Sequence, residues 1–135
     1  MSNDAKVGIV LVSHSAALAS GAAELAAQIS GGTISVVAAG GTDDGRIGTS
    51  IAKVQRALKA ADAGAGVVIL PDMGSSVLTV RALLAEPEED LPEPVALADA
   101  PFVEGAVAAT VTAASGGDLK AVLTAAEEAR HARKL

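Results

Sequence analysis

"VGIVLVSHSAALASGAAELAAQI", residues 7–29, changes character once, at the three polar residues 13–15. The six residues before that point are apolar and mostly β-branched, which is typical of a buried strand. The residues after it are rich in alanine and leucine with polar side chains at intervals, which is typical of a helix. The stretch therefore predicts a strand, a short polar loop and a helix in direct succession.

The same alternation continues along the chain. Four short β-branched runs predict strands, at Val7–Val12, Ile34–Val37, Val67–Leu70 and Val95–Leu97. Segments long enough for helices lie between and after them, at Ala16–Ile29, Thr49–Ala61, Ser76–Ala85, Val103–Ala114 and Leu119–Arg133. Because the strands are continuous apolar runs, helices should cover both faces of the sheet. We predict one domain over residues 1–135, a doubly wound α/β three-layer sandwich around a mostly parallel sheet of four to five strands.

Two local features refine this prediction. Asp118 precedes the last helical segment and is a candidate N-cap. The acidic, proline-containing "EPEEDLPEP", residues 86–94, is typical of an exposed loop before the fourth strand.

The composition limits how the core is built. Half of the 135 residues are hydrophobic, yet Phe102 is the only aromatic residue. The core must therefore consist of alanine, valine, leucine and isoleucine. A surface with few polar side chains favours burial against a second subunit.

Charge and cysteine content exclude several classes of function. The net charge is −6 and the only basic cluster is the tail Arg130–Lys134, so a nucleic-acid partner is not expected. There is no cysteine, and two histidines far apart make a zinc site improbable, so we expect no metal. No apolar run approaches the roughly 20 residues of a membrane span. The early acidic residue and the short apolar run of "MSNDAKVGIVLV" are not what a signal peptide requires, so none is expected. We expect a cytoplasmic protein with no membrane partner.

Polar and glycine-rich residues follow every predicted strand, at residues 13–15, 38–49, 71–76 and 98–105. In an open parallel sheet, ligands bind outside the carboxyl ends of the strands. The four loops should therefore meet at one edge of the sheet, where we place the functional site.

His14 follows the first strand and Asp72 follows the third. A histidine at a strand end is often structural, but His14 lies between two hydroxyl residues at a helix start, where imidazole can act as base, nucleophile or ligand. If the two strands are neighbours, the Asp72 carboxylate can accept one ring N–H, which fixes the tautomer of the imidazole. The alternative for Asp72 is an ordinary helix N-cap.

Gly74, Ser75 and Ser76 open the helix after the third strand. Free backbone N–H groups and hydroxyls at a positive helix end form an anion pocket, although simple capping explains the same residues equally well. In "GGTDDG", residues 40–45, Asp43 and Asp44 would repel a phosphate, so a turn or a partner contact is favoured there.

Several enzyme classes can be excluded because their motifs are absent from the sequence. There is no G-x-S-x-G turn of a serine hydrolase and no G-x-x-x-x-G-K-[ST] loop of a P-loop enzyme. "GAGVVIL", residues 64–70, precedes a strand instead of following one, so it is not a dinucleotide-binding fingerprint. A histidine beside an anion pocket and a carboxylate fits a histidine that becomes phosphorylated.

Four segments carry a family resemblance: "IVLVSHS", "AAGGTDDGRIGTS", "DMGSSVLT" and "APFVEGAVAATVTAASG". In this order they resemble the phosphotransferase subunits of phosphoenolpyruvate-dependent dihydroxyacetone kinases. The first domain of those subunits is similar to mannose-type EIIA domains of the bacterial phosphotransferase system (PTS). The resemblance covers about residues 7 to 117.

The resemblance implies a homodimeric phosphoryl carrier. His14 would take a phosphoryl group from the phosphocarrier HPr, which enzyme I charges from phosphoenolpyruvate, and pass it to ADP. That ADP would be held with magnesium on the nucleotide-binding kinase subunit, so this chain would bind no cofactor itself. Asp72 would orient His14, making Nε2 the phosphorylated (tele) nitrogen, and Ser15, Gly74, Ser75 and Ser76 would line the phosphoryl pocket.

Two other functions fit the same residues. One is an EIIA component of a mannose-class sugar transporter, with an EIIB protein as acceptor. The other is a regulatory module whose partner depends on phosphorylation of His14. Some members of the resembled family continue into HPr-like and enzyme I-like domains, whereas this sequence contains only the EIIA-like part, so separate HPr and enzyme I are expected.

Overall fold

The computed structural model describes residues 4–86 and 90–135. Strands and helices alternate as the sequence predicts, and the elements are β1 (Lys6–Ser13), α1 (Ala16–Ile29), β2 (Val36–Gly40), α2 (Ile51–Ala61), β3 (Gly64–Pro71), α3 (Gly74–Ala85), β4 (Val95–Leu97), α4 (Phe102–Ala114), α5 (Leu119–Glu128) and a 3₁₀ turn (Ala129–His131). The described residues form one four-stranded sheet in the order β2-β1-β3-β4, and all pairs of neighbouring strands are parallel.

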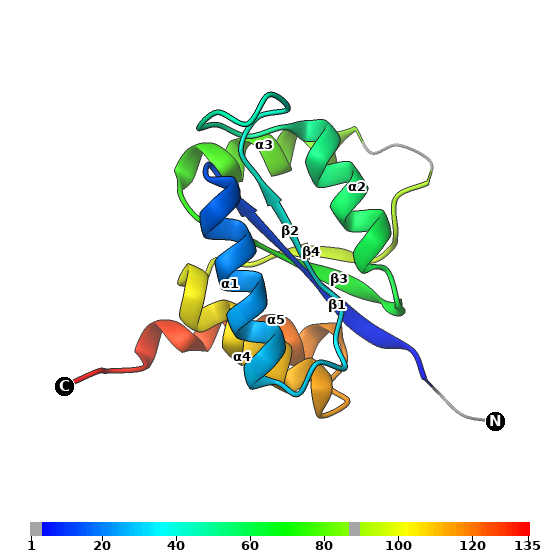
Figure 1. Ribbon diagram of the computed structural model, residues 1–135. Helices are drawn as coiled ribbons and strands as arrows, with labels where there is room; N and C mark the ends of the chain where they lie inside the picture. Colours follow the sequence, from blue (N-terminus) through cyan, green and yellow to red (C-terminus); the bar gives the residue numbers. More distant parts are fainter. Residues whose placement is uncertain (1–3, 87–89) are drawn as a thin grey trace.

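Helices cover both faces of the sheet, as Figure 1 shows. Helices α1, α4 and α5 pack on one face, and α2 and α3 pack on the other. Side chains of β1 pack alternately against the two helical layers. Ile9 and Leu11 belong to one apolar cluster, and Val10 and Val12 belong to the other. This arrangement explains why the strands are continuous apolar runs, and the three-layer α/β fold is confirmed.

Small side chains bring the layers close together. Helix α1 buries only alanines, namely Ala19, Ala22, Ala23 and Ala26. Gly40, the last residue of β2, lies directly against the first turn of α1, where an added Cβ would come within 2.5 Å of the Ser15 carbonyl oxygen. The core of aliphatic residues expected from the composition is thus observed.

Several boundaries differ from the sequence prediction. The second strand begins at Val36 instead of Ile34 and continues to Gly40, because Ala38, Ala39 and Gly40 pair with β1 although none of them favours strands by itself. Glycines of the "GAGVVIL" segment start β3 instead of preceding it. The last helix ends at Glu128 and continues only as the 3₁₀ turn.

The segment 86–94 is not uniformly exposed. Its residues 87–89 lie outside the described residues, but Leu91 is buried in the cluster beneath α2 and α3.

At the start of α5, the side chain of Asp118 accepts a hydrogen bond from the amide of Ala121, so the predicted N-cap is confirmed. Within the described ranges, no helix has both the length and the apolar character that a membrane crossing requires.

Candidate functional site

The candidate site lies where the chain direction across the sheet reverses. From β1 the chain passes to β2 on one side, whereas β3 and β4 lie on the other side. The carboxyl ends of β1 and β3 therefore border the crevice in which open α/β sheets bind ligands. His14 follows β1 directly and Asp72 follows β3 directly, and the Asp72 amide still donates to the carbonyl oxygen of Val12, at 2.9 Å.

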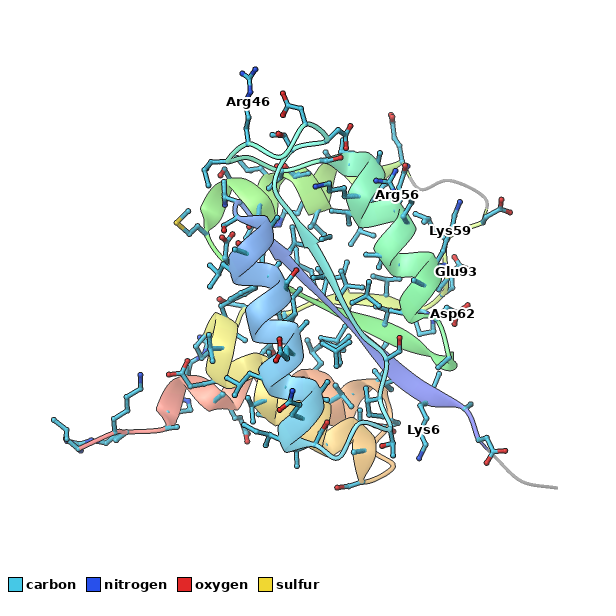
Figure 2. All side chains as sticks on the ribbon, in the orientation of Figure 1. Lys6, Arg46, Arg56, Lys59, Asp62 and Glu93 are labelled. Atoms are coloured by element: carbon cyan, nitrogen blue, oxygen red, sulfur yellow. The ribbon has the colours of Figure 1, made fainter. Side chains whose placement is uncertain are left out.

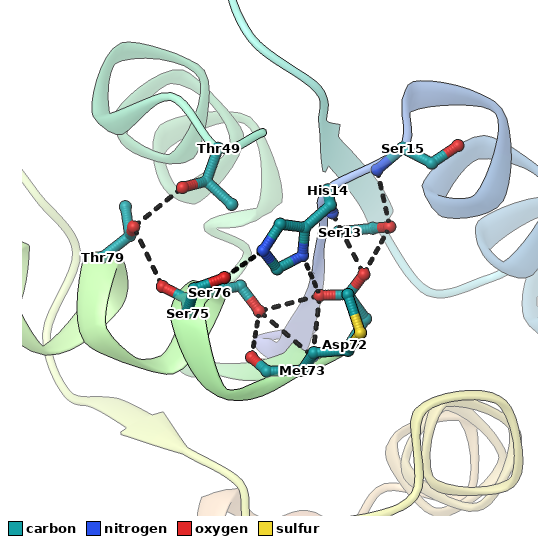
Figure 3. Close-up of polar contacts among 9 residues, drawn as sticks. All are labelled: Ser13, His14, Ser15, Thr49, Asp72, Met73, Ser75, Ser76 and Thr79. Carbon is teal, nitrogen blue, oxygen red and sulfur yellow. Dashed lines mark hydrogen bonds and ion pairs between the residues drawn. The ribbon is translucent and has the colours of Figure 1, made fainter. Parts of the chain in front are cut away.

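The His14 side chain is held by Asp72 (Figure 3). Nδ1 of the imidazole lies 2.9 Å from Oδ1 of the carboxylate, and the backbone amide of His14 donates to Oδ2 at 3.0 Å. The side chains are only 15% and 7% exposed. The adjacency that the sequence prediction required is thus present, and it fixes both the ring and the backbone of His14.

Asp72 accepts hydrogen bonds from three further residues. The Ser13 hydroxyl donates to Oδ2 at 2.9 Å, while the Ser76 hydroxyl and the Met73 amide donate to Oδ1 at 2.8 Å each. Burial raises the pKa of Asp72, but the hydrogen bonds from the His14 amide, the two serine hydroxyls and the imidazole outweigh it and lower the pKa to about 2. Asp72 is therefore an acceptor-only carboxylate at neutral pH.

An ionised Asp72 decides the tautomer of His14. Because both carboxylate oxygens can only accept, Nδ1 must carry the proton in the neutral ring and Nε2 must carry the lone pair. The Ser75 hydroxyl is in short contact with Nε2, so it must be the donor to that nitrogen. The Nε2 nitrogen of His14, which carries the lone pair, thus faces the first turn of α3.

The first turn of α3 offers donors to an anion. Gly74 and Ser75 are the first two residues of this helix. Amide N–H groups at such a position lack intrahelical acceptors, and the helix dipole places its positive end there. An added Cβ at Gly74 would meet no atom within 4 Å, so the space at this turn is open. An anion bonded to Nε2 would therefore lie beside a favourable electrostatic environment.

The other predicted pocket residues, Ser15 and Ser76, have different surroundings. Ser15 is the N-cap of α1, where its hydroxyl accepts from the Leu18 amide at 3.1 Å, and in Figure 3 it lies on the Nδ1 side of the ring. The Ser76 hydroxyl is buried against the Asp72 carboxylate and the carbonyl oxygen of Met73. A contact of either serine with a phosphoryl group stays a prediction.

The loop after β2 is attached to His14. The Gly48 amide donates to the carbonyl oxygen of His14 at 2.9 Å, and the Gly41 amide donates to that of Ser13 at 3.1 Å. Asp43 accepts from the Ser50 hydroxyl at 2.6 Å, and Asp44 pairs with Arg46 at 3.1 Å. Figure 2 shows Arg46 pointing away from the domain at this end, opposite Lys6. The two aspartates thus stabilise the loop, and a partner contact stays a prediction.

Two residues of this site were not identified from the sequence. Ser13 is fully buried and holds Asp72, and a serine that continues an apolar strand directly before the histidine was the available signal. Thr49 contacts Thr79 of α3 next to the site; the sequence pattern placed residue 49 both at the end of the polar loop 38–49 and at the start of a helix, and gave it no role. The second histidine, His131, is exposed in the 3₁₀ turn near the C-terminus. In residues 4–86 and 90–135, no group of three or more acidic or histidine side chains is arranged to hold a metal ion.

Comparison with known proteins identifies the family of the chain. The family model EIIA-man, described as the PTS system fructose IIA component, matches residues 8–123. The chain is 36% identical over 131 residues to the PEP-dependent dihydroxyacetone kinase, phosphoryl donor subunit DhaM, of Providencia stuartii, and this match covers 95% of the chain but 28% of the relative. It is 32% identical over 117 residues to subunit DhaM of PEP-dependent dihydroxyacetone kinase 2 of Listeria innocua, covering 87% of the chain and 94% of the relative.

A solved structure has the same fold. The crystal structure of EF1359, a protein of unknown function, superimposes with a TM-score of 0.80 and 35% sequence identity. The match covers 91% of this chain and 94% of that one. The chain thus spans nearly the whole of some relatives and little more than a quarter of others.

Proposed function

The chain belongs to the EIIA-man family of PTS IIA components, and from this premise we propose that it is the phosphoryl carrier of a phosphoenolpyruvate-dependent dihydroxyacetone kinase. In this proposal Nε2 of His14 accepts a phosphoryl group from phosphorylated HPr. It then passes the group to ADP bound with magnesium on the nucleotide-binding kinase subunit. The observation that carries the proposal is the His14 imidazole, held by Asp72 on Nδ1 and turned with Nε2 toward the start of α3.

The uptake step follows from the tautomer. The Nε2 lone pair forms an N–P bond while the N–P bond of the donor phosphohistidine breaks, and that electron pair returns to the donor ring. The proton on Nδ1 stays in its hydrogen bond to Asp72, so the new phosphoimidazole is cationic at the ring and is stabilised by the adjacent carboxylate. Such a transfer needs little covalent chemistry from the protein beyond positioning and charge stabilisation.

The delivery step reverses these changes. A terminal oxygen of the ADP β-phosphate attacks the phosphorus, the N–P bond of His14 breaks, and the electron pair returns to Nε2. Because the resting tautomer is restored directly, no proton has to be exchanged with water between the two transfers. A ring held in one orientation throughout thereby supports repeated turnover.

The names of the relatives support the choice of acceptor. Both curated relatives described above are phosphoryl donor subunits of dihydroxyacetone kinases. The Listeria relative has almost the same extent as this chain, so an EIIA domain alone is sufficient for a protein of that name. We therefore favour dihydroxyacetone kinase over a sugar transporter as the destination of the phosphoryl group.

Reconstitution without ATP tests the proposal. The mixture contains phosphoenolpyruvate, enzyme I, HPr, the ADP-loaded kinase subunits, dihydroxyacetone and this protein as wild type, His14→Ala or His131→Ala. We expect dihydroxyacetone phosphate with the wild type and with His131→Ala, which removes the exposed second histidine, and none with His14→Ala. Phosphorylation of His14 without product would favour the transporter or regulatory function, and absence of phosphorylation from HPr would contradict the carrier function itself.

A further inference from the structure

The strongest observation outside the proposed mechanism is a pair of threonines beside the Nε2 side of His14. Oγ1 of Thr49, in the loop before α2, lies 2.8 Å from Oγ1 of Thr79 in α3. The Thr79 hydroxyl donates to the carbonyl oxygen of Ser75, at 3.2 Å. A hydroxyl has a single proton, so Thr79 must be the acceptor in its contact with Thr49. In the resting protein, the Thr49 hydroxyl therefore donates to Thr79.

Thr49 is held close to His14 by the backbone. Its preceding residue, Gly48, donates to the carbonyl oxygen of His14. The following residue, Ser50, caps α2 by accepting from the Lys53 amide at 3.1 Å, so Thr49 is fixed between two anchored neighbours. Figure 3 shows Thr49, Ser75 and Thr79 on the side of the ring that carries Nε2, opposite Ser13.

A phosphoryl group on Nε2 would add charged hydrogen-bond acceptors beside Ser75 and Thr49. The Ser75 hydroxyl, now in contact with Nε2, would lose that acceptor and turn to a phosphoryl oxygen. Three charged oxygens would need several donors, and hydrogen bonds to charged acceptors are stronger than those between neutral groups. A neutral hydroxyl such as Thr79 is then a weaker acceptor for Thr49 than a phosphoryl oxygen is.

We propose that Thr49 is a phosphoryl-binding residue, whose hydroxyl donates to Thr79 in the resting protein and to a phosphoryl oxygen once His14 is phosphorylated. This inference rests on the proposed function, since it needs a phosphoryl group on Nε2. The exchange moves one hydrogen bond and no proton, so it adds no chemical step. It assigns to the loop after β2 a direct role in retaining the transferred group.

The exchange predicts opposite effects for the two threonines. Thr49→Val removes a donor to the phosphoryl group, so the phosphorylated form should be disfavoured. Thr79→Val removes the competing acceptor of the resting state, so the phosphorylated form should be favoured. If the pair were only a structural link between the loop and α3, both substitutions would break the same contact and would shift the equilibrium in the same direction.

The test is the equilibrium of phosphoryl transfer between phosphorylated HPr and this protein, read by intact mass or by 31P NMR. We expect the equilibrium constant to fall roughly tenfold for Thr49→Val, to recover for Thr49→Ser and to rise by a few-fold for Thr79→Val. Thr124→Val, on the exposed surface of α5, is the matched control and should behave as the wild type.

The outcomes separate this inference from the proposed function. If the wild type takes no phosphoryl group from HPr, the proposed function is wrong. If the wild type is phosphorylated but Thr49→Val matches it, or if Thr79→Val lowers the equilibrium constant or leaves it unchanged, Thr49 does not bind the phosphoryl group. The Thr79→Val measurement decides the question even if Thr49→Val does not fold.

Discussion

Nδ1 of His14 lies 2.9 Å from Oδ1 of Asp72, across the carboxyl ends of two adjacent strands. The two residues are 58 positions apart in the sequence, and the sheet order alone brings them together. The same carboxylate also accepts from the His14 amide, so it fixes the backbone and the ring at once. Orientation of the imidazole is thereby a direct result of the fold.

Asp72→Asn should slow phosphorylation of His14 by roughly 10²- to 10⁴-fold. An asparagine can present an N–H to Nδ1, which places the proton on Nε2 and removes the nucleophilic lone pair. Single-turnover uptake from phosphorylated HPr measures the rate, and 15N NMR of the ring identifies the tautomer. Asp118→Asn, at the N-cap of α5, is the control and should retain the rate. A wild-type rate in Asp72→Asn would remove Asp72 from the mechanism.

The hydrogen bonds at Asp72 should also make stability depend on pH in acid. Its pKa is lowered from 3.8 to about 2 in the folded protein, so the folded state holds its proton less tightly than the unfolded state does. The stabilisation is therefore complete above about pH 4 and is lost as the pH falls toward about 2. Urea denaturation at a series of pH values should show this loss in the wild type and a shallower slope in Asp72→Asn. Equal slopes would contradict the assignment.

Ser13→Ala should destabilise the protein although it removes a single oxygen atom. The buried hydroxyl donates to Asp72 and accepts from the Ser15 amide at 3.0 Å, so the substitution leaves that amide without its acceptor. We expect a loss of about 1–3 kcal/mol in the free energy of unfolding. Ser115→Ala, whose exposed hydroxyl donates to the Val111 carbonyl oxygen, should change it by less than about 0.5 kcal/mol. Similar values for the two variants would show that the Ser13 hydroxyl is not structural.

The fold was predictable because each strand is a continuous apolar run followed directly by a polar loop. That pattern located His14 and Asp72 at the same edge, but their contact depended on β1 and β3 being neighbours, which is a property of the sheet order. The predicted start of the second strand was wrong because Ile34 is strongly β-favouring by itself. In the structure, the backbone of residues Ala38 to Gly40 pairs with β1. These residue types do not favour strands, so the sequence pattern did not include them.

The loop after β2 was predicted to lie at the edge of the site, but its end and its contacts were not predicted, for a related reason. The alanine-rich pattern placed the helix start at Thr49, whereas the Ser50 hydroxyl caps the helix and α2 begins at Ile51. Residue 49 lay in both the predicted loop and the predicted helix, and the structure places it in the loop, next to the site. Backbone contacts such as that from Gly48 to His14 have no side-chain signature, so only the structure reveals them.

Gly40→Ala should impair both stability and phosphorylation, and Gly21→Ala should impair neither. An added Cβ at Gly40 would lie 2.5 Å from the Ser15 carbonyl oxygen and 2.8 Å from Cα of Ala16, so the first turn of α1 must move away from β2. His14 immediately precedes that turn, and we expect a loss of about 1–3 kcal/mol in the free energy of unfolding together with slower phosphoryl uptake. At Gly21, inside α1, an added Cβ meets nothing within 4 Å.

Alanine at Gly21 should therefore stabilise the helix by up to about 1 kcal/mol through backbone propensity alone. Urea denaturation and single-turnover phosphorylation of both variants provide the measurement. The backbone of Gly40 is not in the left-handed region, so any loss in Gly40→Ala has to come from the contact with α1 and not from backbone strain. A Gly40→Ala variant with wild-type stability and wild-type phosphorylation would mean that this contact does not set the position of His14.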